Sequence, residues 1–150
     1  MTSDERIRAN APATAMPEFA TTAFTPAPAL RNATVAIVTT GGLSVAGQAG
    51  WERGEQTFRA IGADQHDLRM GHWSLNYDRS GFAADLNVVM PIDRLRELAA
   101  DGIIGRVAPR HLSFMGALDE TMATVRMDSG PAAAKLLRDD GVDVVLLTGV

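Results

Sequence analysis

The chain has 150 residues, of which 46% are hydrophobic and 21% charged, a composition typical of one globular domain with a proper core. Its net charge of −4 argues against a nucleic-acid-binding protein, which needs a basic face, and the absence of cysteine excludes disulfides and Cys-based metal sites. No apolar run approaches the roughly 18 residues of a membrane span. Residues 1–10 lack the apolar core of a secretory signal. We therefore expect a cytoplasmic protein.

The first segment, residues 1–30, is expected to be an arm that precedes an α/β domain at residues 31–150. Ala, Pro and Thr dominate residues 11–29, and proline both lacks a ladder amide and pushes its predecessor into an extended conformation. The arm is either disordered or extended over a neighbouring subunit. In the second case Phe19 and Phe24 would be its anchors.

The domain opens with an apolar strand at residues 34–40, followed by Gly41 and Gly42. Two glycines after a strand form either an ordinary turn or a loop whose amides approach a ligand such as a carboxylate. The pair is neither a dinucleotide fingerprint nor a P-loop, because the spacing and the P-loop lysine are missing.

Further along, a long glycine-rich loop is expected at residues 43–56, with Trp51 in its middle. Short strands are expected next, and a polar loop follows them. The strands are predicted at residues 57–61 and 68–75, the second carrying His72, and the loop at 76–81. A helix then begins at Pro91 and closes at Gly102.

Residues 111–116 are read as a strand. Residues 128–131 are expected to interrupt any helix over the ambiguous segment 122–127, with Asp128 or Ser129 capping a new helix that begins at Pro131 and ends at Gly141. The apolar, β-branched run at 142–150 reads as a buried strand. Alternating strands and helices predict a single three-layer α/β domain with a mainly parallel sheet.

Chemistry-bearing side chains crowd into the sixteen positions from residue 72 to residue 87. They are His72, Tyr77, Asp78, Asp85 and Asn87. Such groups can bind a metal or position an amine, although Asp and Asn also cap loops through their own backbone. His111, on the next strand, either converges with His72 or has a structural role.

Ligands of open α/β sheets collect at the carboxyl ends of the strands. We therefore predict one pocket near the end of the 144–150 strand. Its catalytic residues would be His72, Asp78, Asp85 and His111, and its substrate-binding residues Gly41, Gly42, Tyr77 and Asn87. The glycine amides would face a carboxylate. Asp78 or Asp85 would face an amine or fix the tautomer of His72.

Four stretches in this order resemble the selenoprotein B family of the glycine, betaine, sarcosine and D-proline reductases, from about residue 24 to residue 150. They are Phe24-Thr25-Pro26 leading to residues 35–42, residues 78–82 with 85–89, residues 91–98, and Ile104-Gly105 through residues 111–116.

The resemblance implies that the 144–150 strand is followed at once by a selenocysteine or cysteine. This soft nucleophile, which would lie near His111 and be favoured by it in its ionised form, would attack a substrate carbon activated as a Schiff base on the pyruvoyl group of a partner subunit. A dithiol would complete the reductive cleavage of a C–N bond. No cofactor belongs to this chain itself, and an oligomer is expected. The chain is then incomplete at its C-terminus, either at a selenocysteine codon or by truncation, and inactive alone.

Two alternatives stay open. The first is a non-catalytic binding or interaction subunit that has the same fold without the nucleophile. The second is a metal-dependent enzyme built on His72, Asp78, Asp85 and His111.

Overall fold

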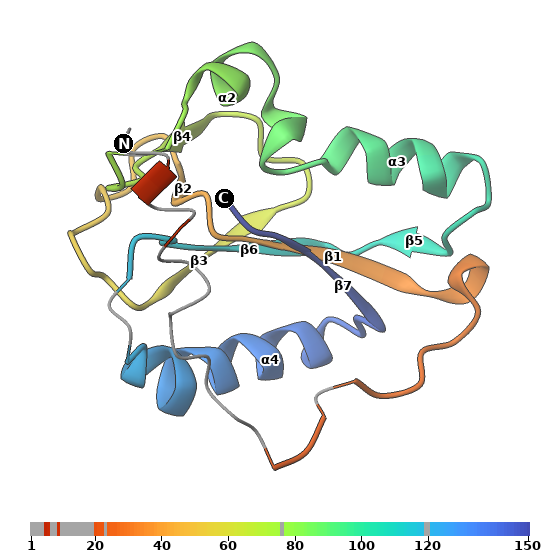
Figure 1. The fold of residues 1–150 in the computed structure, drawn as a ribbon. Coiled ribbons are helices and arrows are strands. Elements are labelled where there is room, and N and C mark those ends of the chain that lie inside the picture. The colour runs from red at the N-terminus through yellow and green to blue at the C-terminus, as the bar shows by residue number, and fades with distance from the viewer. Residues whose placement is uncertain (1–4, 7–8, 10–19, 23, 76, 119–120) are drawn as a thin grey trace.

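A central strand, β1 (Thr34–Thr39), organises the sheet in the computed structural model, which describes residues 5–6, 9, 20–22, 24–75, 77–118 and 121–150 (Figure 1). Parallel strands pair with both edges of β1, and one antiparallel strand lies further out. They are β7 (Val144–Thr148) on one edge, β5 (Arg106–Val107) and β6 (Arg110–Phe114) on the other, and β3 (Phe58–Gly62) beyond β6. The predicted α/β domain with a mainly parallel sheet is confirmed.

Helices cover both faces of the sheet (Figure 1). Val35 and Ile37 point to the face under α3 (Ile92–Ala100), where they join the larger core cluster, which includes Leu95. Ala36 and Val38 point to the opposite face, where α4 (Gly130–Asp139) buries Ala133 and Leu137. This alternation along β1 is what a strand buried on both faces requires. Two short helices precede α3 in the chain, α2 (Ser80–Ala84) and η3 (Leu86–Val88). A third, η2 (Leu30–Asn32), precedes β1.

The helix that precedes β7 starts differently from the prediction. A π-helical turn, η4 (Val125–Ser129), runs directly into α4, so the expected interruption at residues 128–131 is wrong. Ser129 does not cap the helix, because its hydroxyl donates a hydrogen bond to the Gln56 carbonyl oxygen at 2.6 Å. Pro131 fits the first turn of α4, where its missing amide is not needed. Gly102 and Gly141 end α3 and α4 as predicted, with φ of +69° and +68°.

The segment before His72 also differs. The expected loop at 43–56 begins with a strand, β2 (Leu43–Val45), which pairs antiparallel with β4 (Leu68–Met70) in a separate ribbon. β4 therefore ends at Met70, not at residue 75, and His72 lies beyond it. Directly after β4, a Cβ on Gly71 would lie 2.8 Å from Cδ1 of the Trp51 ring, so glycine is favoured at this position.

β7 is not the buried strand that its sequence predicts. Among the residues that the structure describes, β7 pairs with β1 alone, and Leu147 is 74% exposed. In the N-terminal arm, Phe24 is 91% exposed, whereas Phe19 lies outside the described residues. Among the described helices, none combines the length and the apolar character needed to cross a bilayer.

Candidate functional site

The carboxyl ends of three parallel strands meet at one edge of the sheet. Thr40 directly follows β1, Gly116 is the second residue after β6, and Val150 is the second residue after β7. Hydrogen bonds tie two of these ends together. The Thr40 amide donates to the Thr148 carbonyl oxygen at 3.1 Å, and the Val150 amide donates to Thr40 Oγ1 at 2.9 Å. The edge therefore has a fixed shape at the place where open α/β sheets bind ligands.

His72 reaches this edge from the loop after β4. A Cβ placed on Gly116 would lie 2.7 Å from His72 Nε2, 2.9 Å from the Thr40 carbonyl oxygen and 3.2 Å from the Val150 carbonyl oxygen. His72 Nε2 and the end of β7 are thus within about 6 Å of each other. Any side chain at position 116 would fill the space between them.

The protonation state of His72 follows from its partners. The Ser74 amide donates to His72 Nδ1 at 3.2 Å, so the neutral ring carries its proton on Nε2. Burial, and secondarily the charge of Arg79, lowers the pKa of His72 below its usual value, which keeps the ring neutral at pH 7. Nε2 is buried and has no hydrogen-bond partner among the described residues. The site therefore presents an N–H donor that lacks an acceptor.

Neighbours hold the ring of His72 in this orientation. The Tyr77 ring packs against it with 4.8 Å between centroids, and Arg79 Nη2 donates to the His72 carbonyl oxygen at 2.5 Å. On the other side, a Cβ on Gly42 would lie 3.2 Å from the His72 backbone nitrogen, and Gly42 has φ +62°. Glycine is favoured there for both its conformation and the close approach.

Gly41 and Gly42 shape the site and do not offer it free amides. The Gly41 amide donates to Thr39 Oγ1 at 3.1 Å, and the Gly42 amide donates to the Phe114 carbonyl oxygen at 2.9 Å. The idea that these two amides face a carboxylate is therefore not supported by this conformation. A substrate-binding role for the two glycines through shape stays a prediction.

His111 lies inside the sheet. The pairing between β1 and its β5–β6 neighbours is irregular. Thr34 pairs with Arg106 and Val38 pairs with Leu112, so four steps along β1 correspond to six steps along β5 and β6, which therefore hold two extra residues. Within this irregular stretch, His111 Nδ1 accepts a hydrogen bond from the Ile37 amide at 3.0 Å, as a ladder carbonyl would. His111 is fully buried, and burial, followed by the charge of Arg96, lowers its pKa to about 4. This geometry favours the structural role over the catalytic one.

The predicted carboxylates and Asn87 bind backbone and one another. Asp78 Oδ1 accepts from the Ser80 amide at 2.8 Å, and Asp85 Oδ1 accepts from the Asn87 amide at 2.9 Å. Each of these backbone bonds lowers the pKa of its carboxyl group. Asn87 also donates to Asp93 Oδ2 at 3.0 Å. These are the loop-capping contacts of the alternative interpretation, and the catalytic roles of Asp78 and Asp85 stay predictions.

The described residues contain no cluster of three His, Cys, Asp or Glu side chains that could hold a metal ion.

Of the residues predicted for the site, the structure brings His72, Tyr77 and Gly42 together at the strand ends. It adds Thr40 and Gly116, which sequence reasoning missed. Their only sequence signal is that each is the last residue of a strand expected from the sequence, at 34–40 and at 111–116.

Comparison with known proteins gives a consistent set of matches. A sequence profile described as glycine/sarcosine/betaine reductase selenoprotein B (GRDB) matches residues 8–150. D-proline reductase subunit gamma of Acetoanaerobium sticklandii is 34% identical over 122 residues, which are 79% of this chain and 49% of that protein. Sarcosine reductase complex component B subunit beta of Peptoclostridium acidaminophilum is 36% identical over 72 residues, 48% of this chain and 16% of that protein. The chain spans half or less of the length of these relatives. No solved structure matches.

Proposed function

Because the chain belongs to the glycine/sarcosine/betaine reductase selenoprotein B family, we propose that it forms part of a reductase subunit that cleaves a C–N bond in a small amino-acid-like or amine substrate. The observation that carries this proposal is the unpartnered N–H of His72 at the end of β7. By the resemblance, the reacting selenol or thiol would follow Val150. It would then stand next to that donor.

The reaction replaces a C–N bond by a C–H bond and takes up two electrons. The selenolate or thiolate bonds to the carbon, and the nitrogen leaves with the C–N electron pair and takes up a proton. A thiolate of a dithiol then attacks the selenium or sulfur, and the carbon leaves with its bonding pair and gains a proton. The second sulfur closes a disulfide, which restores the nucleophile. The dithiol is therefore the reductant.

His72 would act in this reaction as a hydrogen-bond donor to the anionic nucleophile. A hydrogen bond to the charged form stabilises it and lowers the pKa of a thiol. A neutral N–H in a buried site serves this purpose better than in water, because no water competes for it. A pyruvoyl group on a partner subunit would activate the substrate nitrogen, in line with the resemblance, and the names of both relatives describe subunits of larger reductases.

The first experiment reads the dozen codons that follow Val150. An in-frame selenocysteine codon or a cysteine codon supports the proposal. A true stop with no downstream frame encoding cysteine contradicts it and favours the non-catalytic subunit.

A second experiment tests His72 in the whole protein. We expect His72→Leu, which removes the N–H donor, to raise the pKa of the reacting thiol, measured from the pH dependence of its alkylation rate by iodoacetamide in a cysteine form of the protein. His66→Leu is the matched control, because His66 is exposed. An unchanged thiol pKa in His72→Leu would remove His72 from the proposed site. Glycine, sarcosine, betaine and D-proline, with a dithiol as reductant, are the substrates to compare.

A further inference from the structure

The outer edge of β7 is an unpaired strand edge. Within the described residues, β7 pairs only with β1, from Val35–Val144 to Thr39–Thr148. The Thr148 carbonyl oxygen accepts from β1's neighbour Thr40, and hydrogen-bonding groups alternate along a strand. Those of Val145 and Leu147 therefore point away from β1. They are free to pair with another strand.

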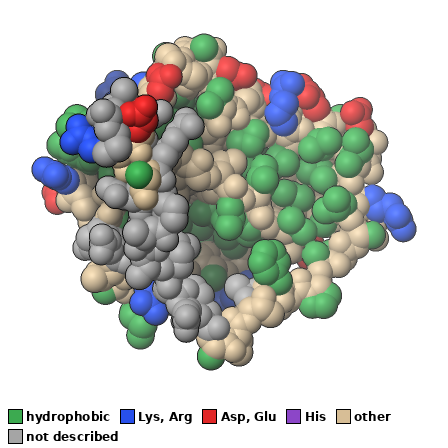
Figure 2. All heavy atoms as spheres, viewed as in Figure 1, with side chains coloured by type: hydrophobic (Ala, Val, Ile, Leu, Met, Phe, Trp, Pro, Cys, Tyr) green, Lys and Arg blue, Asp and Glu red, His purple; other side chains and the backbone are tan. Residues whose placement is uncertain are grey.

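Both faces of β7 also expose apolar side chains. Val145 is 38% exposed and Leu147 is 74% exposed on one face, and Leu146 is 39% exposed on the other. Figure 2, viewed from the same direction as Figure 1, shows hydrophobic side chains gathered on the face of the molecule toward which β7 lies. An apolar run in a parallel sheet is normally buried on both faces. The sequence of β7 is thus that of an interior strand, while its position is that of an edge strand.

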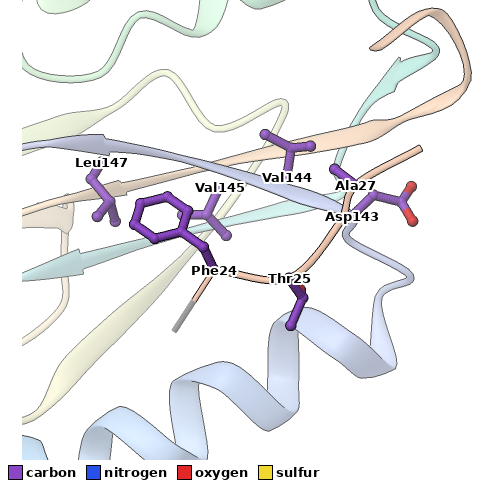
Figure 3. Close-up of a pocket in the computed structure, with 7 residues that line it drawn as sticks. All are labelled: Phe24, Thr25, Ala27, Asp143, Val144, Val145 and Leu147. Carbon is purple, nitrogen blue, oxygen red and sulfur yellow. The ribbon is translucent and has the colours of Figure 1, made fainter. Parts of the chain in front are cut away.

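A cavity of about 460 Å³ lies beside β7, between the strand and the end of the N-terminal arm. Its wall on the arm side comes from Phe24, Thr25 and Ala27, and its other wall comes from β7 and the residue before it, Asp143 (Figure 3). The Phe24 ring lies next to Val145 and Leu147 (Figure 3) but remains 91% exposed. Phe24, Thr25 and Ala27 therefore border this apolar surface, and Leu147 stays 74% exposed beside them.

We infer that the β7 edge is the docking surface for the half of the selenoprotein-B-type subunit that this chain does not represent. That half would add a strand next to β7. The chain matches only 49% of D-proline reductase subunit gamma, so about as much polypeptide again exists in that relative. Burial of β7 requires a neighbouring strand at its free edge and packed side chains on both of its faces. A βα unit from the part of the subunit outside this chain can supply both. The surface is continuous with the site at Val150.

The test uses the 150-residue chain and a defined probe. The probe is the fragment of Acetoanaerobium sticklandii D-proline reductase subunit gamma outside the region that this chain matches, shown to be folded by circular dichroism. Calorimetry measures binding, sedimentation measures stoichiometry, and amide hydrogen exchange reports on β7. We expect a one-to-one complex in which exchange at Val145 and Leu147 slows roughly tenfold or more.

Two lysine substitutions localise the contact. Leu147→Lys is expected to weaken binding of the fragment by roughly tenfold or more, because it places a charge in the interface. Met127→Lys is the matched control, since Met127 is 81% exposed but belongs to η4. An absence of binding, or equal weakening by both substitutions, overturns the inference. Self-association of the chain that Leu147→Lys abolishes also overturns it, because the occupant would then be a second copy.

Discussion

His111→Gln tests whether the buried histidine is a structural element of the sheet. The substitution removes the titrating group but keeps a side-chain oxygen that can accept from the Ile37 amide. Burial lowers the pKa of His111 from 6.5 to about 4 in the folded protein, so between these values the unfolded chain binds more protons than the folded one. Stability therefore rises with pH through this window and levels off above about pH 6.5.

The magnitude follows from the two pKa values. Relative to pH 7.5, His111 should cost the wild type about 2 kcal/mol of unfolding free energy at pH 5, and about 3 kcal/mol well below pH 4. His111→Gln should lack this loss, even if its stability at pH 7.5 is lower. Urea unfolding at pH 7.5 and pH 5 measures the difference. His72 titrates in both proteins alike, so the comparison isolates His111.

Met127→Gln, at an exposed side chain that does not titrate, is the control and should keep the full pH dependence of the wild type. If His111→Gln loses as much stability as the wild type between pH 7.5 and pH 5, His111 is not held neutral by burial. The structural reading would then be wrong, and a solvated, chemically active His111 would have to be reconsidered.

Three further predictions concern the site, the sheet and the isolated chain. Gly116→Ala should lower the free energy of unfolding by about 1–3 kcal/mol, because the alanine Cβ would lie 2.9 Å from the Thr40 carbonyl oxygen and 2.7 Å from His72 Nε2. Unchanged stability together with an unchanged NMR signal of the His72 imidazole would contradict this placement. Arg110→Ala should raise the pKa of Asp140, measured by NMR titration, because the hydrogen bond from the guanidinium at 2.8 Å holds it down; an unchanged pKa would mean that the ion pair does not form in solution. The 150-residue polypeptide alone should show no dithiol-dependent reduction of glycine, sarcosine, betaine or D-proline, since it contains no cysteine for the covalent step, and measurable turnover would refute the need for an added nucleophile.

Local features of the chain were predictable because they depend on neighbours in sequence. The apolar run of β1, the helix beginning after Pro91 and the glycines that end α3 and α4 all carry their signal within a few residues. The order of such elements is enough to predict a parallel α/β sheet. The motifs spread along the chain were likewise enough to indicate the family.

Long-range packing decided the rest. Whether β7 is an interior or an edge strand depends on what lies beyond it, and its own apolar residues carry no information about that. His111 and His72 look alike in sequence, and each has a buried Nε2 without a partner among the described residues. They differ in place: His111 Nδ1 accepts from the Ile37 amide within the sheet, whereas His72 Nε2 lies at the strand ends. Their roles differ because each is set by contacts with residues far away in the chain. Only the tertiary structure brings these together.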